Sequence, residues 1–225
     1  MIFMSKVLVI SPHPDDETFG CGGTLLKHRV NGDLLFWLIM TKMMPEVGYS
    51  EEQMRTRQSE ITSVASAYQF EKVFPLDFAT TTLDTIAQSK LISAITTVVD
   101  QVCPEVVYLP NCSDVHSDHR VTFAAAISSI KTFRTPYIKK VFMYEVLSET
   151  EFAPPFQSSI FLPNSFSDIS DYLEKKIEIM KLYKSELKEH PFPRSEVNLR
   201  ALAIFRGATA TVTSAEAFMI CKEIW

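Results

Sequence analysis

The sequence predicts an α/β fold, a Rossmann-like, doubly wound parallel sheet with helices on both faces. Short β-branched runs alternate with longer amphipathic segments, which is the pattern of strands joined by crossover helices. The longest apolar run, LLFWLIM at residues 34–40, has the length of a buried strand. A chain of 225 residues with 46% hydrophobic and 22% charged residues fits one domain with a sizeable core. We therefore expect a single domain over residues 1–225.

Each element follows from local periodicity. Strands are predicted at residues 6–11, 34–40, 72–76, 105–109 and 139–144, and helices at 19–31, 50–68, 84–101 and 117–131. Residues 148–164 are proline-rich and aperiodic, so they form a loop or an extended arm. Two more helices are predicted at 169–187 and 194–206, separated by EHPFP because proline cannot continue a helix. We expect residues 1–147 to form the sheet core with the functional site, and residues 148–225 to cover it.

Composition and charge exclude several function classes. The net charge of -5 gives no electrostatic basis for binding nucleic acid or an anionic membrane surface. No run approaches the ~20 apolar residues of a membrane span, and the first residues lack the features of a cleavable signal peptide. The four cysteines are widely spaced and form no CxxC pair, which indicates reduced thiols. These features predict a cytoplasmic protein.

Two acidic, histidine-bearing turns lie where predicted strands end. The first holds His13 and Asp16, and the second, about a hundred residues later, holds His116 and His119. Ligands of open α/β sheets bind beyond the carboxyl ends of the strands, so the two turns are expected to converge in space. Imidazole and carboxylate groups suit zinc or another divalent ion, and three protein ligands with an open position are typical of a catalytic site.

The simpler interpretation is that these residues cap helices and bind no metal. An isolated HxxD or HxxH occurs often by chance, and Asp15, Asp16 and Asp118 are residue types that cap helices. Three of the five histidines fall in the two turns, however, and this concentration favours a metal site. His28, beside Lys27, is expected to be solvated, and no role is assigned to it. The glycines of GCGG, residues 20–23, fit close packing of a helix on the sheet better than a dinucleotide-binding turn.

These residues resemble a known family. PHPDDE at residues 12–17 together with HSDHR at 116–120 resembles the two signatures of the PIG-L/LmbE-like zinc deacetylases. The similarity continues through RQSE at 57–60, PLDF at 75–78, RG at 206–207 and AEAF at 215–218, so it covers nearly the whole chain. It is closest to a bacterial branch that acts on amino sugars. Asp114 stands where some members have a tyrosine, so an acid role for that position is not carried over.

The resemblance implies roles for individual residues. By that similarity His13, Asp16 and His119 bind Zn²⁺, and Asp15 is the general base. His116 stabilises the developing oxyanion, with Asp118 orienting its ring, and Arg57 faces the substrate. Relatives often form trimers or hexamers, so a homo-oligomer is compatible with the resemblance, although the sequence shows no heptad repeat. A site of two histidines and one aspartate also accepts iron, cobalt or nickel.

The chemistry of these groups is consistent with amide hydrolysis. Zinc lowers the pKa of its water towards ~7 and polarises a carbonyl, while an adjacent carboxylate can carry the proton to the leaving nitrogen. The leading hypothesis is a hydrolase that removes the N-acetyl group from an N-acetylglucosamine-type glycoside, lipid-linked or nucleotide-linked. One alternative is a de-N-acylase of a thiol glycoside, an antibiotic or another small amide. An alternative of another class is a catalytically silent carbohydrate-binding protein.

Overall fold

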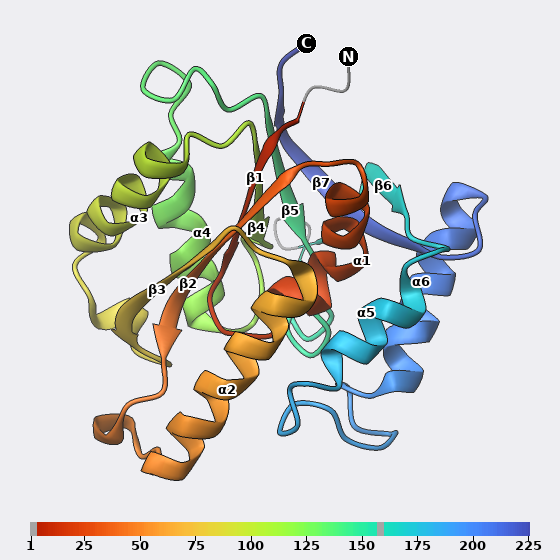
Figure 1. Cartoon of the computed structure of the whole chain (residues 1–225), viewed down its shortest axis with the longest axis horizontal. Helices are drawn as coiled ribbons and strands as arrows, with labels where there is room; N and C mark the ends of the chain where they lie inside the picture. Colours follow the sequence, from red (N-terminus) through yellow and green to blue (C-terminus); the bar gives the residue numbers. More distant parts are fainter. Residues whose placement is uncertain (1–3, 157–159) are drawn as a thin grey trace.

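The computed structural model describes residues 4–156 and 160–225 and confirms the single-domain α/β prediction (Figure 1). Within these residues the strands form one seven-stranded sheet in the order β3-β2-β1-β4-β5-β7-β6. In chain order the elements are β1 (Lys6–Ser11), α1 (Asp16–Val30), β2 (Leu34–Lys42), α2 (Glu51–Tyr68), β3 (Lys72–Ala79), α3 (Gln88–Val102), β4 (Val106–Pro110), α4 (Ser117–Ser129), β5 (Lys140–Tyr144), β6 (Ser165–Asp168), α5 (Leu173–Met180), α6 (Glu196–Ala210) and β7 (Ala215–Glu223). Two short 3-10 helices, η1 (Pro45–Val47) and η2 (Leu83–Thr85), precede α2 and α3.

The five strands predicted from the sequence are all present and mutually parallel. β1 pairs with β2 and β4, β2 with β3, and β4 with β5, so their carboxyl ends meet at one edge of the sheet. The sheet is nevertheless mixed, because β7 runs antiparallel to both β5 and β6. The sequence analysis did not predict these last two strands.

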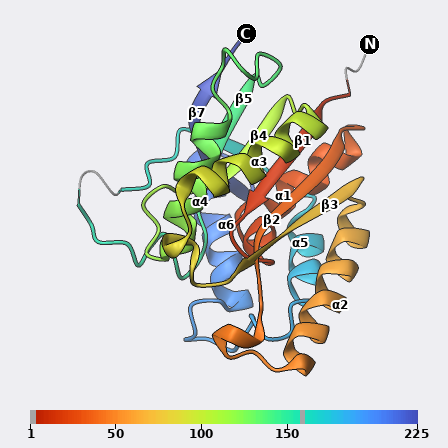
Figure 2. The ribbon, with the colours of Figure 1, turned by 90° about the vertical axis from the view of Figure 1, so that its left-hand side faces the viewer.

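The helices cover both faces of the sheet, as Figures 1 and 2 show. Alternate residues of β1 divide between two hydrophobic clusters, with Val7 and Val9 in one and Leu8 and Ile10 in the other. The first cluster includes residues of α1, α2, α5 and α6, and the second includes residues of α3 and α4. No helix within the described residues has both the length and the apolar character needed to cross a membrane.

The GCGG segment lets α1 approach its neighbours closely. A Cβ atom on Gly20 would lie 2.2 Å from the ring of Tyr144, and one on Gly23 would lie 2.7 Å from Ile169. These distances confirm that the glycines serve packing. The helix also kinks at Cys21, whose φ of -142° and ψ of 21° are not helical.

A buried glutamate of β7 compensates for this kink. The Glu216 carboxylate accepts hydrogen bonds from the backbone amides of Gly23, at 2.8 Å, and Thr24, at 2.7 Å. It also forms a buried ion pair of 2.7 Å with Lys176 of α5. Glu216 therefore joins α1, α5 and β7 at the point where the helix that follows the first acidic turn is irregular.

We predict that Glu216→Gln destabilises the fold by about 3–5 kcal/mol, because it leaves the ammonium of Lys176 buried without a counter-charge. Glu223→Gln is the matched control in the same strand. Its pair with Lys140 is 3.1 Å long but partly exposed, and such pairs contribute about 1 kcal/mol or less. The free energy of unfolding, measured by chemical denaturation, checks both variants. Equal losses would contradict the role given to Glu216.

Candidate active site

The two acidic turns converge at the carboxyl edge of the sheet. The first turn follows β1 and leads into α1, and the second follows β4 and leads into α4. Because β1 and β4 are adjacent parallel strands, both turns end on the same side. The ring centroids of His13 and His119 lie 5.4 Å apart, although the residues are separated by more than a hundred positions.

Asp15 occupies an unusual backbone conformation in the first turn. Its φ of 123° and ψ of -33° lie in a region that residues with a side chain rarely adopt. The amide of Asp15 donates to the carboxylate of Glu17 at 3.0 Å, and the carbonyl of Pro14 accepts from Arg57 at 2.9 Å. Glu17 is in turn held by the hydroxyl of Tyr183, at 2.8 Å. This conformation directs the side chains of Asp15 and Asp16 to different surroundings.

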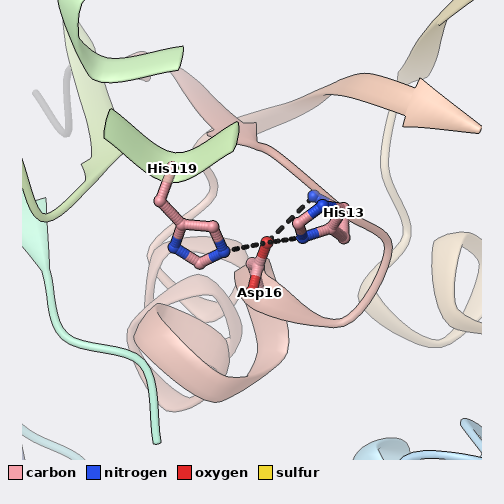
Figure 3. A group of neighbouring side chains, drawn as sticks. All are labelled: His13, Asp16 and His119. Atoms are coloured by element: carbon pink, nitrogen blue, oxygen red, sulfur yellow. Dashed lines mark hydrogen bonds and ion pairs between the residues drawn. The ribbon is translucent and has the colours of Figure 1, made fainter. Parts of the chain in front are cut away.

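His13, Asp16 and His119 form a compact group of potential metal ligands. One ligand atom of each lies within 4.8 Å of the others. The Oδ2 atom of Asp16 is 3.4 Å from Nδ1 of His13 and 3.3 Å from Nε2 of His119, as Figure 3 shows. Two imidazoles and one carboxylate form a donor set of the kind that binds a catalytic divalent ion with an open position.

Each of the two histidines in this group is backed by its own carboxylate. Nε2 of His13 lies 3.1 Å from Oδ2 of Asp118, and Nδ1 of His119 lies 2.8 Å from Oδ2 of Asp114. Such carboxylate partners fix the ring orientation and the tautomer of metal-ligating histidines. The arrangement leaves the second nitrogen of each ring facing Asp16.

The structure places Asp118 differently from the expectation drawn from the resemblance, in which it orients His116. Its carboxylate accepts from the amides of Thr81, at 2.6 Å, and Leu83, at 3.1 Å, as well as contacting His13. The hydrogen bond that the described residues show between Asp118 and His116 comes from the backbone amide of Asp118, which donates to Nδ1 of the ring at 3.1 Å. The side chain of Asp118 therefore supports a candidate metal ligand, because it points back towards β3 and the first turn.

Burial and hydrogen bonding show that this group fits a cation. Oδ1 of Asp16 and Nε2 of His119 are buried and have no hydrogen-bond partner among the described residues. Burial alone lowers the pKa of both rings, but the neighbouring carboxylates outweigh burial and raise the pKa of His13 to about 9 and of His119 to about 10. The histidines in turn hold the pKa of Asp16 well below its usual range, against the effect of burial. The site therefore favours positive charge.

His116 lies beside this group and has a different electrostatic character. Burial, and the nearby ring of His13, lower its pKa to about 4, so it is neutral near pH 7. Because Nδ1 accepts from the amide of Asp118, Nε2 carries the proton of the neutral ring. His116 lines the cavity next to the site, so it can offer a neutral N–H donor to a bound carbonyl group.

The cavity beside the two turns has a volume of about 390 Å³, which is in the range of small-molecule sites. Asp15 lines it, with one oxygen, Oδ1, buried and without a hydrogen-bond partner among the described residues. Burial raises the pKa of the Asp15 carboxyl well above its usual range, although Arg194 opposes this effect. Arg57 also lines the cavity, but most of its guanidinium faces inward, towards Pro14, Glu60 and Glu186.

The sequence analysis missed three residues of this site. Arg194 donates to Asp15 at 3.1 Å and to Glu186 at 3.1 Å. Arg194 and Glu186 lie in the segment between α5 and α6. That segment was assigned in part to a helix ending at residue 187, whereas α5 ends at Met180. The third residue, Asp114, could have been predicted from the sequence. It lies five residues before His119, and metal-binding histidines usually have a carboxylate partner.

His28 also differs from its expected place. It is not solvated, because its ring is bound between the carboxylate of Asp33, at 2.6 Å, and the hydroxyl of Tyr108, at 2.9 Å. Only 18% of its side chain is exposed. Burial lowers its pKa despite the adjacent carboxylate. These contacts join the last turns of α1 to β4.

Comparison with known proteins identifies the family. A sequence model of the PIG-L family, described as GlcNAc-PI de-N-acetylase, matches residues 8–130, which include both acidic turns. The chain belongs to the PIG-L family. The match extends from β1 to the end of α4, so it covers the strands and turns that form the candidate metal site.

Several known proteins resemble the chain over most of its length. Diacetylchitobiose deacetylase of Thermococcus kodakarensis is 28% identical over 91% of this chain and 78% of its own length. Probable N-acetyl-alpha-D-glucosaminyl L-malate deacetylase 2 of Bacillus anthracis is 24% identical over 80% of both chains. The solved structure of N,N'-diacetylchitobiose deacetylase from Pyrococcus horikoshii has a TM-score of 0.79 at 24% identity, covering 97% of this chain and 84% of that one.

Membership of the PIG-L family places this chain among the hydrolytic deacetylases. The family description and the names of both curated relatives agree on this class. The enzyme prediction is thereby confirmed, and the alternative of a carbohydrate-binding protein without catalysis is set aside.

We predict that Asp114→Asn lowers the affinity for Zn²⁺ or Co²⁺ by roughly 10- to 100-fold, because His119 loses the charge that fixes its ring. Competition with a chromophoric chelator measures this affinity. Asp84→Asn, an exposed position, is the control and should bind metal as the wild type does. Unchanged metal binding by a correctly folded Asp114→Asn variant would contradict the role of Asp114.

We also predict that metal affinity rises with pH. The surrounding carboxylates hold protons on His13 and His119, with pKa values of about 9 and 10, and a metal must displace these protons. Affinity should therefore fall as pH is lowered from 8.5 to 6.5, after correction for protonation of the competing chelator. A pH-independent affinity would show that the two rings do not bind the metal.

Proposed function

We propose that this protein is a zinc-dependent N-deacetylase that removes the acetyl group from an N-acetylated amino sugar of the N-acetylglucosamine type. The observation that carries the proposal is that the buried group of His13, Asp16 and His119 adjoins a cavity that is lined by His13 and Asp15. One candidate metal ligand, a candidate base and a hydrogen-bond donor, His13, Asp15 and His116, therefore line a space that a small acetamide can enter.

The ligand set supports zinc. Two histidines and one carboxylate are common ligands of catalytic zinc, and the group includes no thiolate, which structural zinc sites favour. When bound there, the ion would act as a Lewis acid on the acetamide and lower the pKa of water. All the other contributions to catalysis come from the side chains around it.

The side chains of the cavity wall supply the proton transfers. Asp15 accepts the proton of the attacking water at its free Oδ1 atom, and burial makes it a stronger base than an exposed aspartate. The Nε2–H group of His116 donates to the carbonyl oxygen as negative charge develops on it. Asp15 then returns the proton to the leaving nitrogen, and acetate and the free amine are released.

Arg57 supports this reaction as a positioning residue. It holds the carbonyl of Pro14, next to Asp15, and its guanidinium is otherwise bound by Ser185, Glu186 and Glu60. This arrangement favours a role in fixing the first turn over the expected role of facing the substrate directly.

The substrate class is inferred from the relatives and from the size of the cavity. The two curated relatives are named for diacetylchitobiose and for N-acetylglucosaminyl malate, and both compounds contain N-acetylglucosamine. A cavity of about 390 Å³ is large enough to bury an acetamido sugar. The wall formed by Met43, Tyr49 and Met54 adds apolar surface beside the polar groups, which suits the apolar face of a sugar ring.

We predict that Asp15→Asn lowers the rate of acetate release by roughly 10²-fold or more while one metal ion per chain remains bound. The amide of asparagine keeps the size of the side chain but cannot accept the proton. Acetate release and metal content, measured on the same samples, separate the two effects. Asp171→Asn, an exposed substitution, is the control. Undiminished turnover of Asp15→Asn would overturn the assigned base.

A further inference from the structure

The cationic side chains of the cavity wall are all engaged by carboxylates. Lys42, Arg57 and Arg194 line the cavity and carry its permanent positive charges. Lys42, at the rim, pairs with Asp77 at 2.5 Å. The two arginines lie deeper, with 8% and 15% of their side chains exposed, and share a partner in Glu186.

Three of the five N–H groups of Arg57 are bound within the protein. A guanidinium carries five N–H groups. One N–H of Nη1 donates to the carbonyl of Pro14, and Nη2 donates to the hydroxyl of Ser185 and to Glu186. Nε lies 3.3 Å from Glu60 but makes no hydrogen bond within the described residues. The N–H of Nε and one N–H of Nη1 are therefore left over, and these two groups do not form a parallel pair, because Nη2 is fully occupied.

Most N–H groups of Arg194 are likewise bound within the protein. Nε donates to the hydroxyl of Ser148 at 2.7 Å, and Nη2 donates to Glu149 at 3.0 Å. Nη1 donates to Asp15 and to Glu186, both at 3.1 Å. One N–H of Nη2 remains without a partner in the part of the chain that the structure describes. Neither arginine can therefore offer the pair of parallel N–H groups that binds a carboxylate or a phosphate in the bidentate manner.

Glu186 is the group that keeps both arginines occupied. Its Oε1 atom binds Arg57, and its Oε2 atom binds Arg194. The side chain is 20% exposed and itself lines the cavity, so its negative charge also acts on whatever enters. The other partners of the two arginines are Glu60, Glu149 and Asp15, so carboxylates outnumber guanidiniums in this cluster.

From this arrangement we propose that Glu186 is a specificity-determining residue that restricts the cavity to acetamido sugars whose attached group is uncharged. The inference rests on the proposed function and narrows its substrate class. An anionic aglycone, such as a phosphate or a malate, would find no free bidentate donor and would face the Glu186 carboxylate. A neutral sugar or a simple glycoside meets neither obstacle.

The test compares two matched substrates, the methyl α-glycoside of N-acetylglucosamine and N-acetylglucosamine 1-phosphate. Acetate release gives kcat/KM for each, and the ratio between the two cancels effects common to both. The wild type should prefer the methyl glycoside. Glu186→Gln removes the negative charge and frees donors on both arginines. The ratio of kcat/KM values should therefore shift towards the phosphate by roughly tenfold, which corresponds to the free energy of one hydrogen bond to a charged group.

Glu174→Gln is the matched control. It removes the carboxylate from the ion pair between Glu174 and Arg200, and neither residue lines the cavity. It should leave the ratio unchanged. An unshifted ratio in a folded Glu186→Gln variant would overturn the proposal. The wild type provides a second test that needs no variant, since equal or better hydrolysis of the phosphate would overturn it too. Hydrolysis of neither compound, nor of any other N-acetylated amino sugar, would instead contradict the proposed function.

Discussion

The backbone of Asp15 is the constraint on which the site depends. Three proposed functions, a metal ligand at His13, a base at Asp15 and a second ligand at Asp16, come from four residues of one turn. Adjacent side chains can face different surroundings only if the backbone between them turns sharply, and Asp15 achieves this with a φ of 123°. A residue held in such a region costs about 1–3 kcal/mol, so the surrounding structure must stabilise it.

That stabilisation comes from the C-terminal third of the chain. Tyr183 binds Glu17, which accepts the amide of Asp15, and Arg194 binds the Asp15 carboxylate directly. Arg57, which holds the preceding carbonyl, is itself fixed by Glu186. The irregular segment between α5 and α6 supplies Tyr183, Glu186 and Arg194. These groups hold the first turn in a conformation that it would not adopt alone.

Much of this arrangement can be predicted from the sequence. The elements and site residues that the sequence does not predict have physical reasons for escaping it. The five parallel strands are apolar and periodic, and the rule that ligands bind at strand ends correctly predicts that His13 and His119 lie close together. β7 was missed because its residues, AEAFMICKE, include alanine, glutamate and lysine, which have low strand propensity, and its pairing with β5 and β6 is a tertiary effect. Arg194 and Glu186 were missed because an irregular segment has no periodicity to fix where its side chains point.

We propose that a metal ion held by His13, Asp16 and His119 is required for amide hydrolysis at this cavity. The most direct measurement is acetate release from an N-acetylglucosamine glycoside during titration of chelator-treated protein with Zn²⁺. We expect chelation to abolish activity, and we expect activity to return in proportion to added metal and to reach its maximum at one ion per chain. Activity that survives complete removal of metal, or that returns equally well in a His119→Ala variant, would contradict it.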